Sequence, residues 1–157
     1  MNNDVFFISR AVQLAAESVA DGSGGPFGAV VVRAGKIVGE GRNQVVPTRD
    51  PTAHAEVMAI RAACAVLDSF HLTGCTLYAS SEPCPMCLSA AYWARVDRIV
   101  FANPRAAAAA IGFCDDELYA ELRLPHAERR LETVQLPVPG ADEPLLRWYR
   151  NPAKSRY

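Results

Sequence analysis

The feature that most constrains this chain is a pair of short motifs that together carry one imidazole, two thiols and one carboxylate. The first motif is His54-Ala-Glu56, and the second is Pro83-Cys84-Pro-Met-Cys87. These side chains are typical metal ligands, and a metal that binds both motifs must bring two distant segments to one point. The fold must therefore place the start of one predicted helix beside the start of the next.

The number of available ligands indicates which kind of metal site this is. Zinc with three protein ligands keeps its fourth position open for water, which is the catalytic arrangement. His54, Cys84 and Cys87 are the predicted zinc ligands. Glu56 lies two residues after His54, on a different side of the same helical turn, and is predicted to carry protons to and from that water.

Two other interpretations use the same cysteines. A structural zinc ribbon needs a second Cys-x-x-Cys or a His pair, which the remaining cysteines do not supply: Cys64, Cys75 and Cys114. A thiol-disulfide oxidoreductase is the alternative from a different class, because Cys84-Pro-Met-Cys87 follows a predicted strand and opens a predicted helix. That alternative leaves His54 and Glu56 without a role.

Helical and strand patterns alternate along the chain and favour an α/β layered fold. Helices are predicted over residues 4–20, 52–67, 85–95, 104–110, 115–124 and 144–151. Strands are predicted over residues 27–32, 37–43, 75–80, 98–102 and 131–138. The helix that carries His54 is expected to start at Thr52 or Asp50, either of which is a good cap. The whole chain, 1–157, is predicted to form a single domain.

Composition excludes several classes of function. The 157 residues carry a net charge of −1, without the basic excess typical of proteins that bind long nucleic acids. No apolar run reaches the ~18–20 residues of a membrane helix. The start of the sequence, residues 1–4, lacks the features of a signal peptide. Five cysteines without a secretory signal suggest a reducing compartment, so we expect a cytoplasmic protein.

The joint motif resembles the signature of the zinc-dependent cytidine deaminase-like superfamily. Further stretches are similar to bacterial guanine deaminases, at residues 24–29, 50–57, 81–87, 92–95 and 111–113. The resemblance implies a three-layer fold, with a mixed sheet of about five strands between helices, and one zinc ion per subunit. It also implies a homodimer, and leaves open an exchange of the C-terminal segment between subunits.

The activity that the resemblance implies is hydrolytic deamination of a free nucleobase, with guanine to xanthine plus ammonia as the preferred reaction. Guanosine, cytosine, a pterin or a triazine would also suit a compact pocket. A tRNA adenosine deaminase shares the zinc chemistry but needs a basic face for RNA. The basic residues near the C-terminus form too small a cluster for that: Arg147, Arg150, Lys154 and Arg156.

The resemblance also implies contacts to the ring. Asn43 is expected to hydrogen-bond the base, and the backbone N–H of Ala55 to polarise it. Phe27 and Trp93 are candidates to stack on the ring, with core packing as the alternative for each. Tyr157 is expected to cap the pocket, as part of a C-terminal helix and tail over residues 140–157.

One position departs from the family pattern. Guanine deaminases of this type place an acid directly after the Gly-Phe pair, where it pairs with the purine edge. Here Cys114 occupies that position, and the acids follow at Asp115 and Asp116. A thiol is a poor substitute for a carboxylate that accepts two donors. Either Asp115 serves instead, or a different ring edge is recognised.

Overall fold

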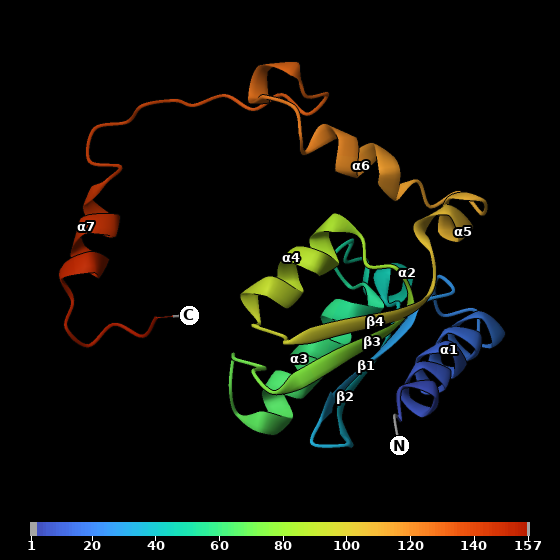
Figure 1. The fold of residues 1–157 in the computed structure, drawn as a ribbon. Coiled ribbons are helices and arrows are strands. Elements are labelled where there is room, and N and C mark those ends of the chain that lie inside the picture. Colours follow the sequence, from blue (N-terminus) through green and yellow to red (C-terminus); the bar gives the residue numbers. More distant parts are fainter. Residues whose placement is uncertain (1–2, 157) are drawn as a thin grey trace. The chain divides into compact units, whose positions relative to one another are not determined.

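The computed structural model describes residues 3–156. Its chain divides into two compact units, residues 1–116 and 117–157, and each is described by itself (Figure 1). The sheet and both predicted motifs lie in the first unit. The assignment of residues 1–157 to a single domain stays a prediction. Within the described residues, every helix is too short or too polar to cross a membrane.

The first unit contains a four-stranded mixed sheet in the order β2-β1-β3-β4. Strand β1 pairs antiparallel with β2 and with β3, and β3 pairs parallel with β4. These four strands were predicted to within one residue at each end, which confirms the α/β class and the mixed sheet. Their bounds are β1 (Gly28–Arg33), β2 (Lys36–Arg42), β3 (Cys75–Ser81) and β4 (Arg98–Asn103).

The expectation of about five strands is wrong, because residues 131–138 form no strand. The segment has the apolar alternation of a strand, but Leu131 is 79% exposed and Leu136 is 80% exposed. A strand needs a neighbour that accepts its ladder hydrogen bonds, and Pro137 removes one donor from this segment. The β-formers alone therefore do not produce a strand there.

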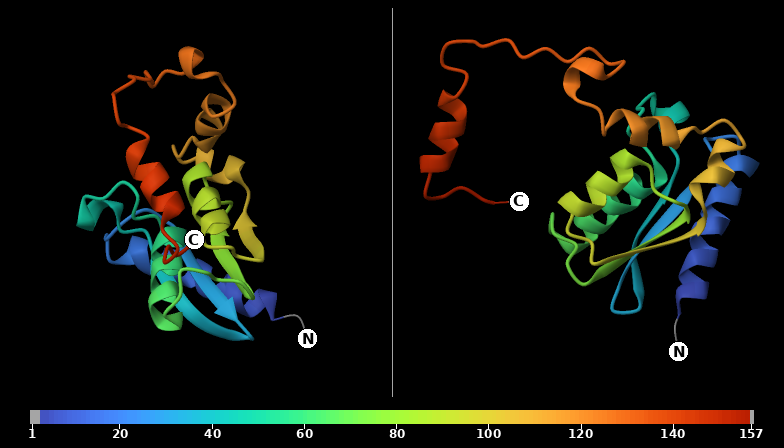
Figure 2. Two further views of the ribbon diagram at one scale, coloured as in Figure 1. Left: turned by 90° about the vertical axis from the view of Figure 1, so that its left-hand side faces the viewer. Right: turned by 45° about the horizontal axis from the view of Figure 1, so that its top comes forward.

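Helices cover both faces of the sheet (Figures 1 and 2). Val30 and Val32 of β1 pack in the same cluster as the buried face of α1. Ala29 and Val31 point the other way and pack with α3 and α4. This alternation is the two-residue period of a strand that is buried on both sides. The helices of this unit are α1 (Asp4–Ala20), α2 (Val45–Thr48), α3 (Ala55–Leu67), α4 (Pro85–Trp93) and α5 (Arg105–Ala109).

Two glycines of β2 allow α3 to lie directly on the sheet. A Cβ atom added at Gly41 would collide with the carbonyl oxygen of Ala55, and one added at Gly39 would collide with that of Ala59. Glycine permits this close approach of strand and helix because it has no side chain. Ala55 directly follows His54, so the packing of β2 fixes the end of α3 that carries a predicted zinc ligand.

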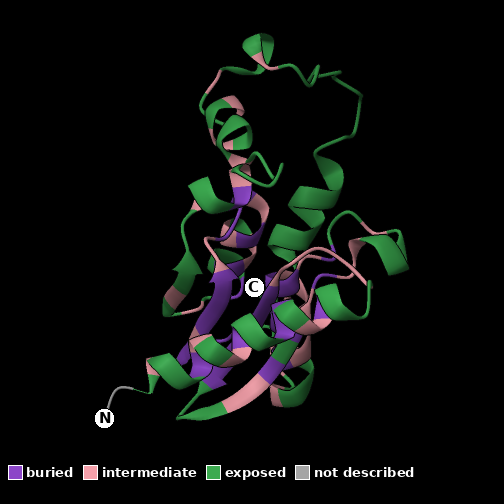
Figure 3. Ribbon diagram, turned by 90° about the vertical axis from the view of Figure 1, so that its right-hand side faces the viewer, coloured by how far each residue is buried: buried purple, intermediate pink, exposed green. Residues whose placement is uncertain are grey.

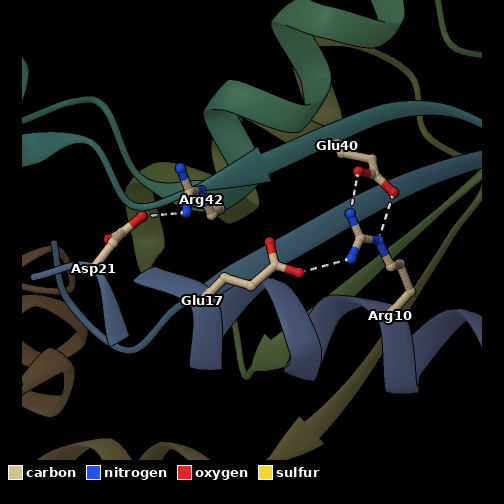
Figure 4. Close-up of polar contacts among 5 residues, drawn as sticks. All are labelled: Arg10, Glu17, Asp21, Glu40 and Arg42. Atoms are coloured by element: carbon tan, nitrogen blue, oxygen red, sulfur yellow. Dashed lines mark hydrogen bonds and ion pairs between the residues drawn. The ribbon is translucent and has the colours of Figure 1, made fainter. Parts of the chain in front are cut away.

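Ion pairs connect α1 to β2 along the outer edge of the unit (Figure 4). The guanidinium of Arg10 donates to both carboxylate oxygens of Glu40, at 2.8 and 2.7 Å, and to Glu17 at 3.0 Å. The Nη1 atom of Arg42 donates to Asp21 at 2.7 Å. The hydrogen bonds from Arg10 lower the pKa of Glu40 below its ordinary value. These partly exposed pairs stabilise the edge modestly.

The described part of the second unit has no buried core. No described residue from 117 to 156 is buried, and Figure 3 shows this part of the chain mostly in the colour of exposed residues. Its elements are the rest of α6 (Asp115–Glu121), the short 3₁₀ helix η1 (His126–Glu128) and α7 (Glu143–Arg150). Arg130 pairs with Glu117 at 3.2 Å and with Glu121 at 3.3 Å. The apolar side chains of α7 are exposed: Leu145, Leu146, Trp148 and Tyr149.

Candidate active site

The two motifs meet where α3 and α4 begin. His54 is the N-cap residue of α3, Cys84 is the N-cap residue of α4, and Cys87 lies in the first turn of α4. Helix N-termini present free N–H groups and a partial positive charge, which favour thiolates over thiols. The two helix N-termini that meet here therefore favour anionic sulfur ligands.

The predicted start of α3 is wrong by about three residues. Neither Asp50 nor Thr52 caps the helix, which begins at Ala55. The Oδ1 atom of Asp50 instead accepts the backbone N–H of Thr52 at 2.8 Å and its hydroxyl at 2.6 Å. Asp and Asn often close such a local turn two residues ahead. This turn places His54, rather than Thr52, at the helix start.

The ligand atoms have the separations that zinc requires. The Nδ1 atom of His54 lies 3.6 Å from the Sγ atom of Cys84 and 3.5 Å from that of Cys87. All three ligand atoms lie within 4.8 Å of one another. A tetrahedral ion about 2.3 Å from sulfur and about 2.0–2.1 Å from nitrogen separates these atoms by about 3.6 Å. One imidazole and two thiols therefore fit zinc in geometry and in ligand type.

The three ligands also perturb one another's protonation. The pKa of Cys84 is lowered to about 4, first by the hydrogen bond that the Cys87 thiol donates and then by His54. The pKa of His54 is raised, chiefly by its hydrogen bond with Cys84. A thiolate at Cys84 is the form that binds a metal. The cluster therefore holds a ready anionic ligand near neutral pH.

Glu56 lies beside the ligands but remains outside their cluster. Its side chain is buried, with 8% exposure. Burial raises the pKa of its carboxyl to about 7, and the charge of Cys84 adds to that rise. A carboxyl that titrates near neutral pH can both accept and return a proton. A dication held by the neighbouring ligands would lower this pKa again.

A cavity of about 230 Å³ opens onto His54, Glu56 and Cys84. Pockets for drug-sized molecules hold about 300–1,000 Å³, so this one suits a smaller ligand such as a single flat ring system. The rest of its lining comes from loops and from the first residues of α2 and α6: Gly25, Phe27, Asn43, Val45, Val46, Pro51, Glu82, Phe113 and Asp115. A larger open hollow of about 910 Å³ is lined by residues of α7 and by Asn151, which follows it, and by none of the predicted ligands.

Three of the predicted ring contacts line this cavity: Phe27, Asn43 and Asp115. The Oδ1 atom of Asn43 accepts the backbone N–H of Val45 at 3.2 Å and that of Gly25 at 3.4 Å. These bonds fix the orientation of the amide, so its N–H groups are the ones that a ligand can use. Burial raises the pKa of Asp115, and the charge of Cys84 adds to that rise.

Among the described residues, Trp93, Cys114 and Ala55 are predicted contacts that do not line the cavity. Trp93 is 67% exposed and ends α4, about 14 Å along the helix axis from its start. Cys114 is exposed. Ala55 is fully buried in the first turn of α3, beside His54. Tyr157 lies outside the described residues. The roles assigned to these four residues stay predictions.

Sequence reasoning did not assign a role to Glu82 or Phe113, both of which line the cavity. The ring of Phe113 meets that of Phe27 edge to face, with centroids 4.8 Å apart. The sequence feature that indicates a turn before Phe113 is Gly112, and in the structure its φ is +97°. The short helix α2, which was not among the predicted helices, carries Val45 and Val46 into the wall.

Comparisons with known proteins agree with this geometry. Residues 1–103 match the model of the cytidine and deoxycytidylate deaminase zinc-binding region. The guanine deaminase of Bacillus subtilis is 46% identical over the full length of both chains, and its crystal structure superposes with a TM-score of 0.95. A tRNA-specific adenosine deaminase of Aquifex aeolicus is 43% identical over 76 residues, which cover 48% of this chain and 50% of that one.

These similarities make the chain a zinc-dependent aminohydrolase. It belongs to the family of cytidine and deoxycytidylate deaminases that share this zinc-binding region. The predicted superfamily, fold and zinc cofactor are confirmed, as is the similarity to a bacterial guanine deaminase.

Proposed function

We propose that this enzyme hydrolyses guanine to xanthine and ammonia. The observation that carries the proposal is a ring-sized cavity with an amide donor, Asn43, and a carboxylate acceptor, Asp115, beside the zinc ligands. Guanine presents both a carbonyl acceptor and ring N–H donors, so it can satisfy both groups. The full-length similarity to a guanine deaminase supports the same substrate.

His54, Cys84 and Cys87 would hold the zinc ion, whose Lewis acidity lowers the pKa of water at the site to about 7. Glu56 accepts the proton that the attacking water releases and delivers it to the ring nitrogen beside the amino-bearing carbon. Glu56 then takes the proton of the hydroxyl that the attacked carbon now carries and gives it to the amine; the C–N bond breaks, the carbonyl of the product forms, and the amine leaves as ammonia. Its burial beside the ligands supports this role, because the carboxyl is shielded from bulk water.

The cavity walls would bind and orient the ring. The Asn43 amide donates to a ring acceptor, and the Asp115 carboxylate accepts from ring N–H groups. Phe27 and Phe113 pack edge to face, which leaves aromatic surface for the ring to contact. The backbone N–H of Ala55, at the start of α3, polarises the ring. Tyr157 would cap the cavity.

The proposal includes a homodimer in the cytoplasm. Apolar side chains on α7 are exposed, and no described residue from 117 to 156 is buried. A segment of this size does not form a stable core alone, so a second copy of the chain is a suitable partner for it. Exchange of this segment between subunits would place the tail, residues 140–157, against the partner. Five free cysteines are consistent with a reducing compartment.

The test is ammonia release from a panel of rings by the zinc-loaded protein: guanine, guanosine, cytosine, a pterin and a triazine. We expect guanine to give the highest kcat/KM. The similarity to a tRNA-specific adenosine deaminase makes an anticodon stem-loop the second substrate to test. If the enzyme deaminates the stem-loop but not guanine, the proposal is wrong and the enzyme is a tRNA adenosine deaminase. A protein purified without chelator that carries no zinc and has disulfide exchange activity would support the oxidoreductase alternative instead.

A further inference from the structure

Arg105 joins two segments that carry cavity residues. Its backbone N–H donates to the Oε2 atom of Glu82 at 2.9 Å. Its side-chain Nε lies 3.5 Å from the Oε1 atom of Glu82 and 3.3 Å from the Oδ1 atom of Asp116. Glu82 lines the cavity, and Asp116 directly follows the lining residue Asp115. One guanidinium therefore lies between the two segments.

The Glu82 end of this bridge is firmly attached to the sheet. Glu82 follows β3, two residues before the zinc ligand Cys84, and its backbone N–H donates to the carbonyl of Asn103 at 2.8 Å. The side chain of Asn103 donates in turn to the carbonyl of Ser80 at 2.9 Å. Glu82 is thus fixed relative to the ligands before Arg105 binds it.

The Asp116 end belongs to a segment with weaker support. Gly112 has a φ of +97° and no atom close to the position of a Cβ, so the backbone there is open. The backbone N–H of Phe113 bonds to Ala108 at 3.1 Å, and that of Asp115 bonds to Phe113 at 3.1 Å. These hydrogen bonds hold the segment to itself and to α5, and the ring of Phe113 also contacts that of Phe27, just before β1. The ion pair of Arg105 with Asp116 supplies a connection toward the sheet.

Charge gives a second reason for a cation at this place. Three carboxylates line the cavity, at Glu56, Glu82 and Asp115, beside the thiol ligands. Like charges in a partly buried site repel one another. Burial raises the pKa of Asp115, and the positive charge of Arg105 opposes that rise. Arg105 therefore favours the carboxylate form that accepts ring N–H groups.

We propose that Arg105 is a positioning residue: by bridging Glu82 and Asp116 it holds Phe113 and Asp115 in the cavity wall and thereby sets the affinity for the ring. The inference rests on the proposed function only in the choice of guanine as substrate. Removal of the bridge weakens ring binding and leaves proton transfer by Glu56 intact. The effect therefore belongs in KM rather than in kcat.

The variants are Arg105→Gln, Asp116→Asn and the double variant, all loaded with zinc. Arg10→Gln is the matched control, because Arg10 also joins two carboxylates, Glu17 and Glu40, but lies outside the cavity. We expect each single variant to raise KM for guanine roughly 1.5- to 5-fold, the scale of partly exposed ion pairs. The double variant should be no worse than Arg105→Gln alone, because both changes break one bridge.

Hydrogen exchange gives a readout that needs no substrate. In Arg105→Gln and in Asp116→Asn, the amides of Phe113 and Asp115 should exchange faster than in the wild-type holoenzyme, whereas Arg10→Gln should leave them unchanged. Unchanged exchange in Arg105→Gln, or KM effects of the two single variants that simply add, would overturn the inference. Failure of the wild-type enzyme to release ammonia from guanine would instead overturn the proposed function, and the exchange result would still decide the role of Arg105.

Discussion

The Nδ1 atom of His54 lies 3.5 Å from the Sγ atom of Cys87, although the two residues come from different helices. Their proximity depends on α3 and α4 reaching the same edge of the sheet with their N-terminal ends. The glycines of β2 set the position of α3, and the parallel β3-α4-β4 unit sets that of α4. Zinc binding is therefore a property of the whole first unit.

Substitution Cys87→Ser should remove zinc and activity together. An alcohol is a much poorer zinc ligand than a thiolate, and losing a direct ligand should cost at least about 100-fold in affinity. Zinc content per chain and ammonia release are measured on the same preparation. Cys64→Ser is the control, because Cys64 is a free cysteine outside the ligand cluster. Full zinc occupancy in Cys87→Ser would exclude this ligand set.

Substitution Glu56→Gln should separate metal binding from catalysis. The amide keeps the size of the side chain but cannot accept the proton, so turnover should fall by about 10²–10⁴-fold. Zinc content should stay at the wild-type level, because Glu56 is outside the ligand cluster. Glu17→Gln on α1 provides a control with unchanged turnover. A Glu56→Gln enzyme within about tenfold of wild type would contradict the proton-transfer role.

Substitution Asp115→Asn tests which residue replaces the acid of the family pattern. A hydrogen bond to a charged group contributes about 1.5–3 kcal/mol, so KM for guanine should rise roughly 10- to 100-fold. Cys114→Ser should leave KM nearly unchanged, because Cys114 is exposed and outside the lining. Steady-state kinetics of both variants decide the matter. The reverse result would assign recognition of the ring edge to position 114.

The Arg10–Glu40 pair should make stability depend on acid pH. The folded-state pKa of Glu40 is lowered, so its contribution is present above the ordinary carboxyl pKa and is lost as the pH falls through the folded value. Wild type should exceed Glu40→Gln by about 0.5–1 kcal/mol near neutral pH, with the difference disappearing in acid. Thermal unfolding across this range measures it. In an Arg10→Gln background the difference should be absent at every pH, and its persistence there would show that Arg10 is not the cause.

The sequence predicted the strands of the first unit well because their signals are local. The run of valines in β1 ends at the two-residue turn of Ala34 and Gly35, which pairs Arg33 with Lys36 and so sets the register with β2. The start of α3 was mispredicted because two local structures compete for Asp50. Its carboxylate can cap a helix or close a turn onto Thr52, and the structure has the turn. Sequence spacing does not distinguish the two.

The grouping of His54, Cys84 and Cys87 could be predicted from residue types and motif spacing, but most of the cavity wall could not. Glu82 and Phe113 become neighbours of the ligands only through the path of the chain after β4 and α5. Glu82 contacts Arg105, and Phe113 contacts Phe27, across long stretches of sequence. No periodic sequence pattern predicts such contacts. Residues 131–138 have the local sequence pattern of a strand. They form no strand, because no neighbouring strand pairs with them in the structure.

Neither His54 nor Cys84 makes the side-chain hydrogen bond that an N-cap residue ordinarily gives its helix. A good cap contributes about 0.5–2 kcal/mol, and coordination of the ion by these two predicted ligands would constrain the same two positions. The apoprotein therefore begins two helices without that support, and the ion supplies the constraint in its place. Removal of zinc by a chelator should thus promote fraying of α3 and α4 together. A variant that binds zinc less tightly should therefore also unfold at a lower temperature.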